Sequence, residues 1–255
     1  MKPPNDWIVP EWPAPEGVRA LSTTRQGGGR EAGRGRFSGF NLGAHVGDNE
    51  KVVARNRARL IEKTGVMPVW LNQTHGTRVV DIGDPALPVL PEADGAVVRI
   101  PGRACVVMTA DCLPVLFCDT RGSVAAAAHA GWRGLCAGIL EAVVRKMDVS
   151  GDEILAWLGP AIGPLSFEVD GDVRRAFTGS DSEAGAEKAF AVSKIEGKWL
   201  ADLYCLARRR LERLGIEKIY GGGLCTLRDV ERFFSYRRDG QTGRMASLVW
   251  LARHQ

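Results

Sequence analysis

Apolar positions along the chain follow two periods, which predict three helices and a larger number of short strands. Helical spacing, with an apolar residue at every third or fourth position, marks a segment that ends near Thr64 and the segments 134–147 and 202–214. Asp48 or Asn49 is a suitable N-cap for the first of these helices. Between the helices the chain carries short apolar runs rich in β-branched residues, and such runs are typical of strands.

Several of the predicted strands are apolar on both faces, as expected for strands that are buried inside the fold. Some connections between them are too short to contain a helix. A mixed sheet, or two stacked sheets with helices outside, therefore fits the pattern better than a simple alternation of strand and helix. The predicted strands span 69–71, 78–82, 96–100, 105–109, 115–118, 124–128, 154–158, 218–220 and 247–251.

Length and composition indicate an ordinary soluble globular protein. Its 255 residues, 45% of them hydrophobic, can bury a core without disulfides or structural metals. No internal repeat or linker is visible, so we expect one domain over residues 1–255, with residues 1–18 peripheral. The net charge of +4 is dispersed, and the densest basic run, Arg208–Arg210, lies in a predicted helix close to Glu212. A solvated helix face explains this run better than a nucleic-acid surface does.

The cysteines and the N-terminal residues predict the compartment. Six cysteines are present, without a Cys-x-x-Cys pair and without the regular spacing of a disulfide scaffold. The first seven residues lack the apolar core of a signal peptide, and no apolar run is long enough to span a bilayer. We therefore expect a reduced, cytoplasmic protein that has no membrane partner and no evident obligate protein partner.

One stretch of low complexity, Gly27–Gly39, is rich in glycine and arginine. Its composition predicts a mobile surface loop, and a flap whose arginines approach an anion is the alternative. It does not match the phosphate-loop pattern Gly-x4-Gly-Lys-Ser/Thr.

Three residues in short, unusual contexts carry the candidate chemistry: His75, Cys112 and His129. Two imidazoles and one thiolate form a usable zinc site, and three protein ligands leave a coordination position open for chemistry. All three lie at the ends of predicted strands or in the adjacent loops, where sites commonly form. Spacing alone does not prove contact, so an ordinary core role for each residue stays open beside a metal or catalytic site.

Polar residues elsewhere suggest contacts for a substrate. The glycine-rich turn after His129 enters a predicted helix, where unpaired N–H groups and the helix dipole suit an anion, and Arg133 adds a positive charge. A capping turn with a surface arginine is the alternative there. Arg25 and Arg237 are further candidates for binding phosphate, and Asn41 for hydrogen bonding to a base or a ribose.

Taken together, these stretches resemble the laccase-domain purine nucleoside phosphorylase family, whose members were formerly named multicopper polyphenol oxidases and in part peptidoglycan editing factors. The resemblance extends from about Arg19 to Leu251. It implies an α/β fold of the α+β type, a four-layer α/β/β/α sandwich with mixed sheets that is similar to cytotoxic necrotizing deamidase toxins. The stretches that carry the resemblance are 41–48, 72–76, 110–114, 129–134 and 235–240.

The resemblance also implies a function. It implies zinc at His75, Cys112 and His129, with copper as the alternative metal, and catalysis by these same residues. The implied reaction is phosphorolysis of adenosine, inosine, guanosine and methylthioadenosine with phosphate as co-substrate, together with adenosine deamination. The usual nucleobase-deaminase signature, His-x-Glu with Pro-Cys-x-x-Cys, is absent, so deamination would use a site unrelated to the one in those deaminases.

Three other functions stay open. A multicopper oxidase fits poorly, because multicopper centres rely on many imidazoles and the chain has four: His45, His75, His129 and His254. A metal-free thiol hydrolase would use Cys112 as nucleophile and a histidine as base. The third is the editing of a wrongly built cell-wall precursor. In the zinc hypothesis His45 is either a nearby polar residue or a fourth ligand that closes the site.

Overall fold

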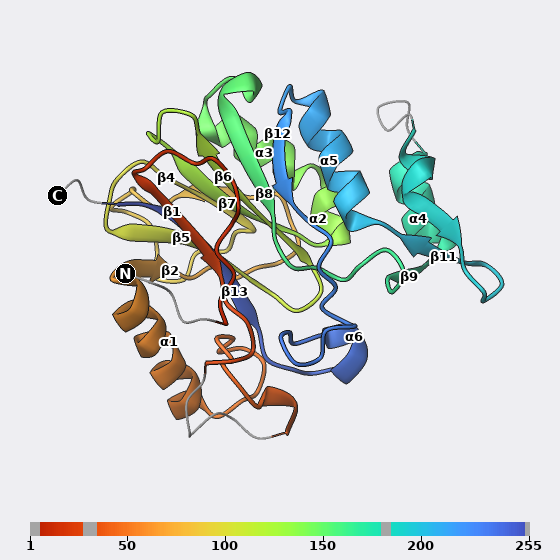
Figure 1. Cartoon of the computed structure of the whole chain (residues 1–255), viewed down its shortest axis with the longest axis horizontal. Helices are drawn as coiled ribbons and strands as arrows, with labels where there is room; N and C mark the ends of the chain where they lie inside the picture. Colours follow the sequence, from red (N-terminus) through yellow and green to blue (C-terminus); the bar gives the residue numbers. More distant parts are fainter. Residues whose placement is uncertain (1–5, 28–34, 180–184, 253–255) are drawn as a thin grey trace.

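The computed structural model describes residues 6–27, 35–179 and 185–252. Two β-sheets pack face to face, and helices cover the outer side of each sheet (Figure 1). Both sheets contain parallel and antiparallel neighbours. This mixed α/β/β/α arrangement confirms the fold class predicted from the sequence, whereas the similarity to deamidase toxins stays a prediction.

The first sheet has the strand order β1-β13-β5-β2. The side chains of its two central strands alternate strictly between the two faces of the sheet. Val106 and Leu248 point to the outer core under helix α1, while Val107 and Val249 point to the core between the sheets. The period of two in these strands therefore builds two cores at once. The elements are β1 (Val18–Ser22), β13 (Met245–Leu251), β5 (Arg103–Thr109), β2 (Met67–Val69) and α1 (Glu50–Thr64).

The second sheet has the strand order β12-β8-β6-β7-β4-β3. Strand β7 is nearly all alanine, and such small side chains let helix α3 and the first sheet approach it from opposite sides. The elements are β3 (Val79–Asp81), β4 (Gly95–Val98), β6 (Leu113–Asp119), β7 (Ala125–Ala130), β8 (Ile154–Leu158), β12 (Lys218–Gly221), α2 (Trp132–Ala137), α3 (Ile139–Met147) and α5 (Leu203–Arg213).

A smaller three-stranded sheet with helix α4 lies beside α5 at one side of the molecule (Figure 1). It was not predicted, because its strands are short and half exposed and lack a clear apolar period. Its elements are β9 (Glu168–Asp170), α4 (Gly171–Thr178), β10 (Phe190–Val192) and β11 (Lys198–Ala201), and the remaining helices are η1 (Gly35–Phe37), η2 (Gly151–Glu153), η4 (Ala186–Ala189) and α6 (Tyr236–Asp239).

The structure differs from the sequence prediction at further places, and strand β1 was not predicted. The helix predicted over 134–147 is two helices, because Gly138 has φ 100° and its left-handed backbone ends α2 before α3 begins. Strand β7 continues to Ala130, so His129 lies inside the strand and not at its end. The segment 6–18 is not wholly peripheral, since Trp7 is buried against Phe40.

The predicted loop 27–39 is only partly described, and its residues 28–34 lie outside the described residues. The part that is described includes η1 and Gly39, whose φ of 122° brings its Cα against the carbonyl of Arg25. A side chain at position 39 would collide with that carbonyl. Within the described parts of the chain, no helix is long and apolar enough to cross a membrane.

Candidate metal centre

His75, Cys112 and His129 converge at one end of the second sheet. Their ligand atoms all lie within 4.8 Å of one another. The Sγ of Cys112 is 3.8 Å from Nε2 of His75, and the two imidazole centroids are 4.8 Å apart. His75 is exposed, Cys112 is half-buried and His129 is buried. The cluster is therefore anchored in the core through His129 and open to solvent on the side of His75.

Strand register brings two of the three residues together. Strands β6 and β7 are antiparallel, with Pro114 opposite His129 and Leu113 opposite Ala130. Cys112, which immediately precedes β6, is thereby placed beside the end of β7. His75 comes from the loop between β2 and β3. The pairing of β6 with β7 does not position this loop, so a separate contact must hold His75 beside the other two residues.

Asp94 provides that anchor. Its Oδ1 accepts hydrogen bonds from the backbone N–H of His75 and from Nδ1 of His129, each within 2.9 Å. Its Oδ2 accepts from the backbone N–H groups of Thr74 and Gly76. The carboxylate has no solvent exposure. One buried side chain therefore orients both histidines, although Asp94 was not among the residues predicted from the sequence.

The turns around the cluster adopt uncommon backbone conformations. His75 and Asp111 have φ values of 63° and 102°, in the left-handed region that non-glycine residues seldom occupy. Gly131 approaches the cluster so closely that a Cβ there would lie 2.8 Å from Cδ2 of His75 and 2.9 Å from Sγ of Cys112. Such backbone outliers concentrate at functional sites. Glycine at position 131 leaves the space in which the three ligand atoms meet.

The electrostatics of the cluster favour a thiolate. Burial raises the pKa of the Cys112 thiol, but attraction to His129 and hydrogen bonds with both imidazoles lower it to about 6. Burial lowers the pKa of His129, whereas attraction to Cys112 and the hydrogen bond with Asp94 raise it to about 9. Without a metal, Cys112 and His129 form a thiolate–imidazolium pair near neutral pH. A cation that binds here would displace the proton of His129.

The donor set fits a zinc ion. One thiolate and two imidazoles match the ligands of catalytic zinc sites, in which a fourth position stays open. Nδ1 of His129 faces Asp94, so its Nε2 is left for a metal, and a carboxylate behind a histidine ligand is the usual supporting partner. Among the described residues the group contains three donors and does not include His45, while His254 lies outside them.

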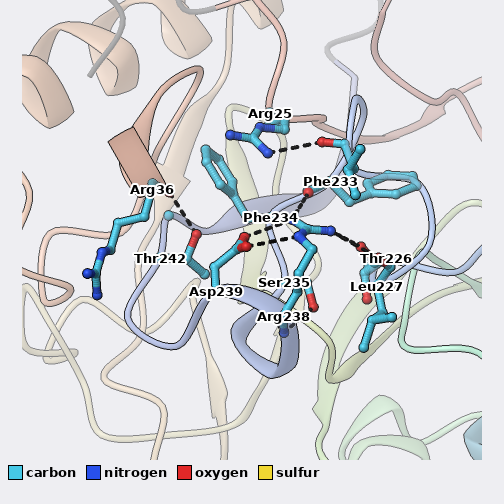
Figure 2. Close-up of polar contacts among 12 residues, drawn as sticks. Arg25, Arg36, Thr226, Leu227, Phe233, Phe234, Ser235, Arg238, Asp239 and Thr242 are labelled. Carbon is cyan, nitrogen blue, oxygen red and sulfur yellow. Dashed lines mark hydrogen bonds and ion pairs between the residues drawn. The ribbon is translucent and has the colours of Figure 1, made fainter. Parts of the chain in front are cut away.

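Asp111, the residue before Cys112, connects the cluster to residues 226–239 by hydrogen bonds. The Asp111 carboxylate accepts a hydrogen bond from Oγ1 of Thr226 and one from the backbone N–H of Arg237, both 2.6 Å long. Figure 2 shows Arg238 at the centre of this segment, paired with Asp239. Its guanidinium also donates to three backbone carbonyls, those of Thr226, Leu227 and Phe233.

Two of the predicted substrate residues are engaged elsewhere in the chain. Arg25 donates to the carbonyls of Val230 and Ser38, and its guanidinium lies 5.0 Å from the ring centroid of Phe234 (Figure 2). The amide of Asn41 is buried. Its oxygen accepts from two backbone N–H groups and its nitrogen donates to two oxygens, which uses its full hydrogen-bonding capacity. In this structure Asn41 holds its own loop in place.

The other two predicted residues are exposed. Arg237 donates to the carbonyl of Glu168 and lies 5.4 Å from the ring centroid of Phe167, so its side chain reaches toward the small sheet. Arg133 lies over the ring of Trp132, at 4.5 Å from the centroid. Arg133 is the second residue of α2, a helix of only six residues. In the described structure no contact joins either guanidinium to the cluster of His75, Cys112 and His129.

Comparison with known proteins gives one family over nearly the whole chain. The family described as multi-copper polyphenol oxidoreductase laccase matches residues 19–252. Purine nucleoside phosphorylase PA4543 of Pseudomonas aeruginosa is 53% identical over 247 residues, covering 97% of this chain and 99% of its own. Purine nucleoside phosphorylase YfiH of Escherichia coli is 51% identical, covering 96% and 98%. The crystal structure of Neisseria meningitidis protein NMB0706 has a TM-score of 0.90 and 47% identity, covering 98% of this chain and all of that one.

Proposed function

The chain belongs to the family of multi-copper polyphenol oxidoreductase laccases, and we propose that it acts as a zinc-dependent purine nucleoside phosphorylase in the cytoplasm. The geometry that carries the proposal is the cluster of His75, Cys112 and His129, three donors within 4.8 Å of one another. Relatives that are more than half identical to the chain are named purine nucleoside phosphorylases, which supports the choice of substrate.

The donor set supports zinc in preference to copper oxidase chemistry. The family description mentions several copper ions, and oxidases of that kind need several imidazole-rich centres. Among the described residues, a single group of three or more His, Cys, Asp or Glu meets the geometry of a metal site. A zinc ion bound there would supply Lewis acidity at an open position.

The proposed reaction is phosphorolysis of adenosine, inosine, guanosine and methylthioadenosine. An oxygen of inorganic phosphate forms a bond to C1′ of the ribose as the C1′–N9 bond breaks, and the departing purine takes up a proton. The products are ribose 1-phosphate, or its methylthio analogue, and the free base. Adenosine deamination at the same cluster is proposed as the accompanying activity.

Incubation of the zinc-loaded protein with adenosine, with and without phosphate, tests the proposal. We expect adenine and ribose 1-phosphate to form only when phosphate is present, and a small amount of inosine in both samples. Chromatography separates all of these products. Adenine formed equally well without phosphate would identify a hydrolase, and no turnover of any nucleoside would reject the proposed substrate class.

One observation favours a second candidate function. A chain of contacts runs from Cys112 to His129 and from His129 to Asp94. It has the order of a thiol nucleophile, a general base and an orienting carboxylate. A thiol hydrolase built on these residues, or an enzyme that edits a cell-wall precursor with them, would work in the presence of a chelator and lose activity on alkylation of Cys112. The zinc enzyme loses activity with the chelator and recovers it when zinc is restored.

A further inference from the structure

Arg244 lies beside the metal cluster and was not predicted from the sequence. It immediately precedes β13, whose first residue, Met245, pairs with Thr109. Because the two strands are antiparallel, Arg244 is placed opposite the turn that follows Thr109 and carries Cys112. Met245 and Ala110 also share one small buried core, which joins the two segments at this end of the sheet.

The backbone and side chain of Arg244 are held in one position. Its N–H donates to Oδ1 of Asn41, and its carbonyl accepts from the N–H of Leu42. One terminal nitrogen, Nη1, donates to the carbonyls of Thr242 and Gly243. The side chain passes closely over Gly43, where a Cβ would lie 2.8 Å from Cγ of Arg244. The buried amide of Asn41 thus fixes the segment from which the guanidinium projects.

The guanidinium of Arg244 is half-buried without a carboxylate partner, since no Asp or Glu oxygen of the described residues forms an ion pair with it. The acidic groups near enough to act on its charge include Cys112 and Asp111. The Asp111 carboxylate is already occupied by Thr226 and Arg237. A zinc ion on Cys112 would neutralise that thiolate as well, and Asp111 would then act on the guanidinium without forming an ion pair with it in the described structure.

One more cationic group, Arg57, lies on the same side. The charges of Arg244 and Arg57 both act on His45 and, with burial as the larger cause, lower its pKa. Arg57 donates to the carbonyl of Leu42 and lies 3.9 Å from the ring centroid of Trp70, again without a carboxylate partner in the described structure. Two guanidinium groups on the same side of the candidate metal centre suit a small dianion, because fixed guanidinium groups bind phosphate oxygens directionally.

We propose that Arg244 binds the phosphate that attacks the nucleoside, with the guanidinium donating from Nε and Nη2 to the phosphate oxygens. This inference rests on the proposed phosphorylase function. The residue holds one oxygen of the dianion toward C1′ of the ribose. As the new C1′–O bond forms and the C1′–N9 bond breaks, the phosphate keeps its contact with Arg244 while the purine leaves with a proton.

Steady-state rates over a range of phosphate concentrations test the inference with Arg244→Gln and Arg244→Lys. We expect Arg244→Gln to raise the KM for phosphate roughly 10- to 100-fold, the effect of removing a charged hydrogen-bond donor, while the KM for adenosine changes by less than about twofold. Arg244→Lys keeps the charge but loses the paired geometry, so it gives an intermediate KM. The matched control is Arg103→Gln at the start of strand β5, the end away from Thr109, where the guanidinium donates to the carbonyl of Ile82.

Calorimetric titration of the zinc-loaded proteins with inorganic phosphate separates this inference from the proposed function. If the wild type cleaves adenosine with phosphate and Arg244→Gln has an unchanged KM for phosphate, the inference is overturned. If the wild type cleaves no nucleoside, the proposed function fails, and the titration alone then tests whether Arg244 binds phosphate. Phosphate binding that is lost in Arg244→Gln, weakened in Arg244→Lys and kept in Arg103→Gln supports the site. Equal binding in all proteins, or none in the wild type, overturns it.

Discussion

Replacement of Cys112 by alanine is expected to lower bound zinc from about one ion per chain to below about 0.1, and to lower kcat/KM for adenosine by more than about 100-fold. The thiolate is one of three protein donors, and two imidazoles alone leave the ion weakly held. Changes to the residues behind zinc ligands already cost 10- to 100-fold, so loss of a ligand costs more. Elemental analysis of the purified variant and the rate of phosphorolysis measure the two effects.

Cys118→Ala is the matched control for this variant. Cys118 lies near the far end of β6, the strand that Cys112 precedes, and is fully buried. Its loss removes packing worth about 1 kcal/mol without touching the cluster. We expect this control to keep its zinc and its activity. A Cys112→Ala protein that retains full activity after chelation would reject the zinc mechanism and the thiol mechanism together.

Asp94→Asn is expected to lower zinc affinity and activity roughly 10- to 100-fold while leaving all three ligands in the chain. The carboxylate accepts hydrogen bonds from His75, His129 and the neighbouring turn, and it has no exposed surface. An amide at this position turns one acceptor into a donor that faces N–H groups. Zinc titration against a competing chelator measures the affinity, and thermal unfolding measures the accompanying loss of stability, about 3 kcal/mol.

Asp119→Asn separates the two effects of the Asp94 substitution. Asp119 is equally buried, at the end of β6 away from the cluster, and it accepts hydrogen bonds from Ser123 and Val124. We expect it to lose a similar amount of stability and no zinc affinity. If both variants bind zinc as tightly as the wild type does, Asp94 has only a structural role.

Apart from β1, the strands of the two large sheets and the three candidate ligands were accessible from the sequence because their signals are local. Runs such as those of β6 and β8 are apolar at nearly every position, and buried strands of this length satisfy that pattern. His75, Cys112 and His129 were recognised by the turns around them. Their meeting in space was a hypothesis, since it depends on the pairing of β6 with β7 and on a loop from another part of the sheet.

The rest of the site depends on long-range contacts that no local pattern encodes. Asp94 is a single acidic residue before a buried strand, and its role comes from the loop 74–76 that folds over it. Asn41 was predicted to contact a base or a ribose, which stays a prediction, and its hydrogen bond to the backbone of Arg244, about two hundred positions away, was not predicted. The sequence offered two signals. One was an acidic residue just before an apolar strand, and the other was an arginine just before β13.

A zinc K-edge X-ray absorption spectrum of the purified wild-type protein tests the central claim most directly. The account predicts about one zinc per chain with one sulfur neighbour at about 2.3 Å and two imidazole nitrogens at about 2.0 Å, the distances of a mixed cysteine and histidine site. A zinc shell without sulfur, or a protein that carries copper or no metal at stoichiometric level, would contradict the assignment of Cys112 and the two histidines as the metal centre.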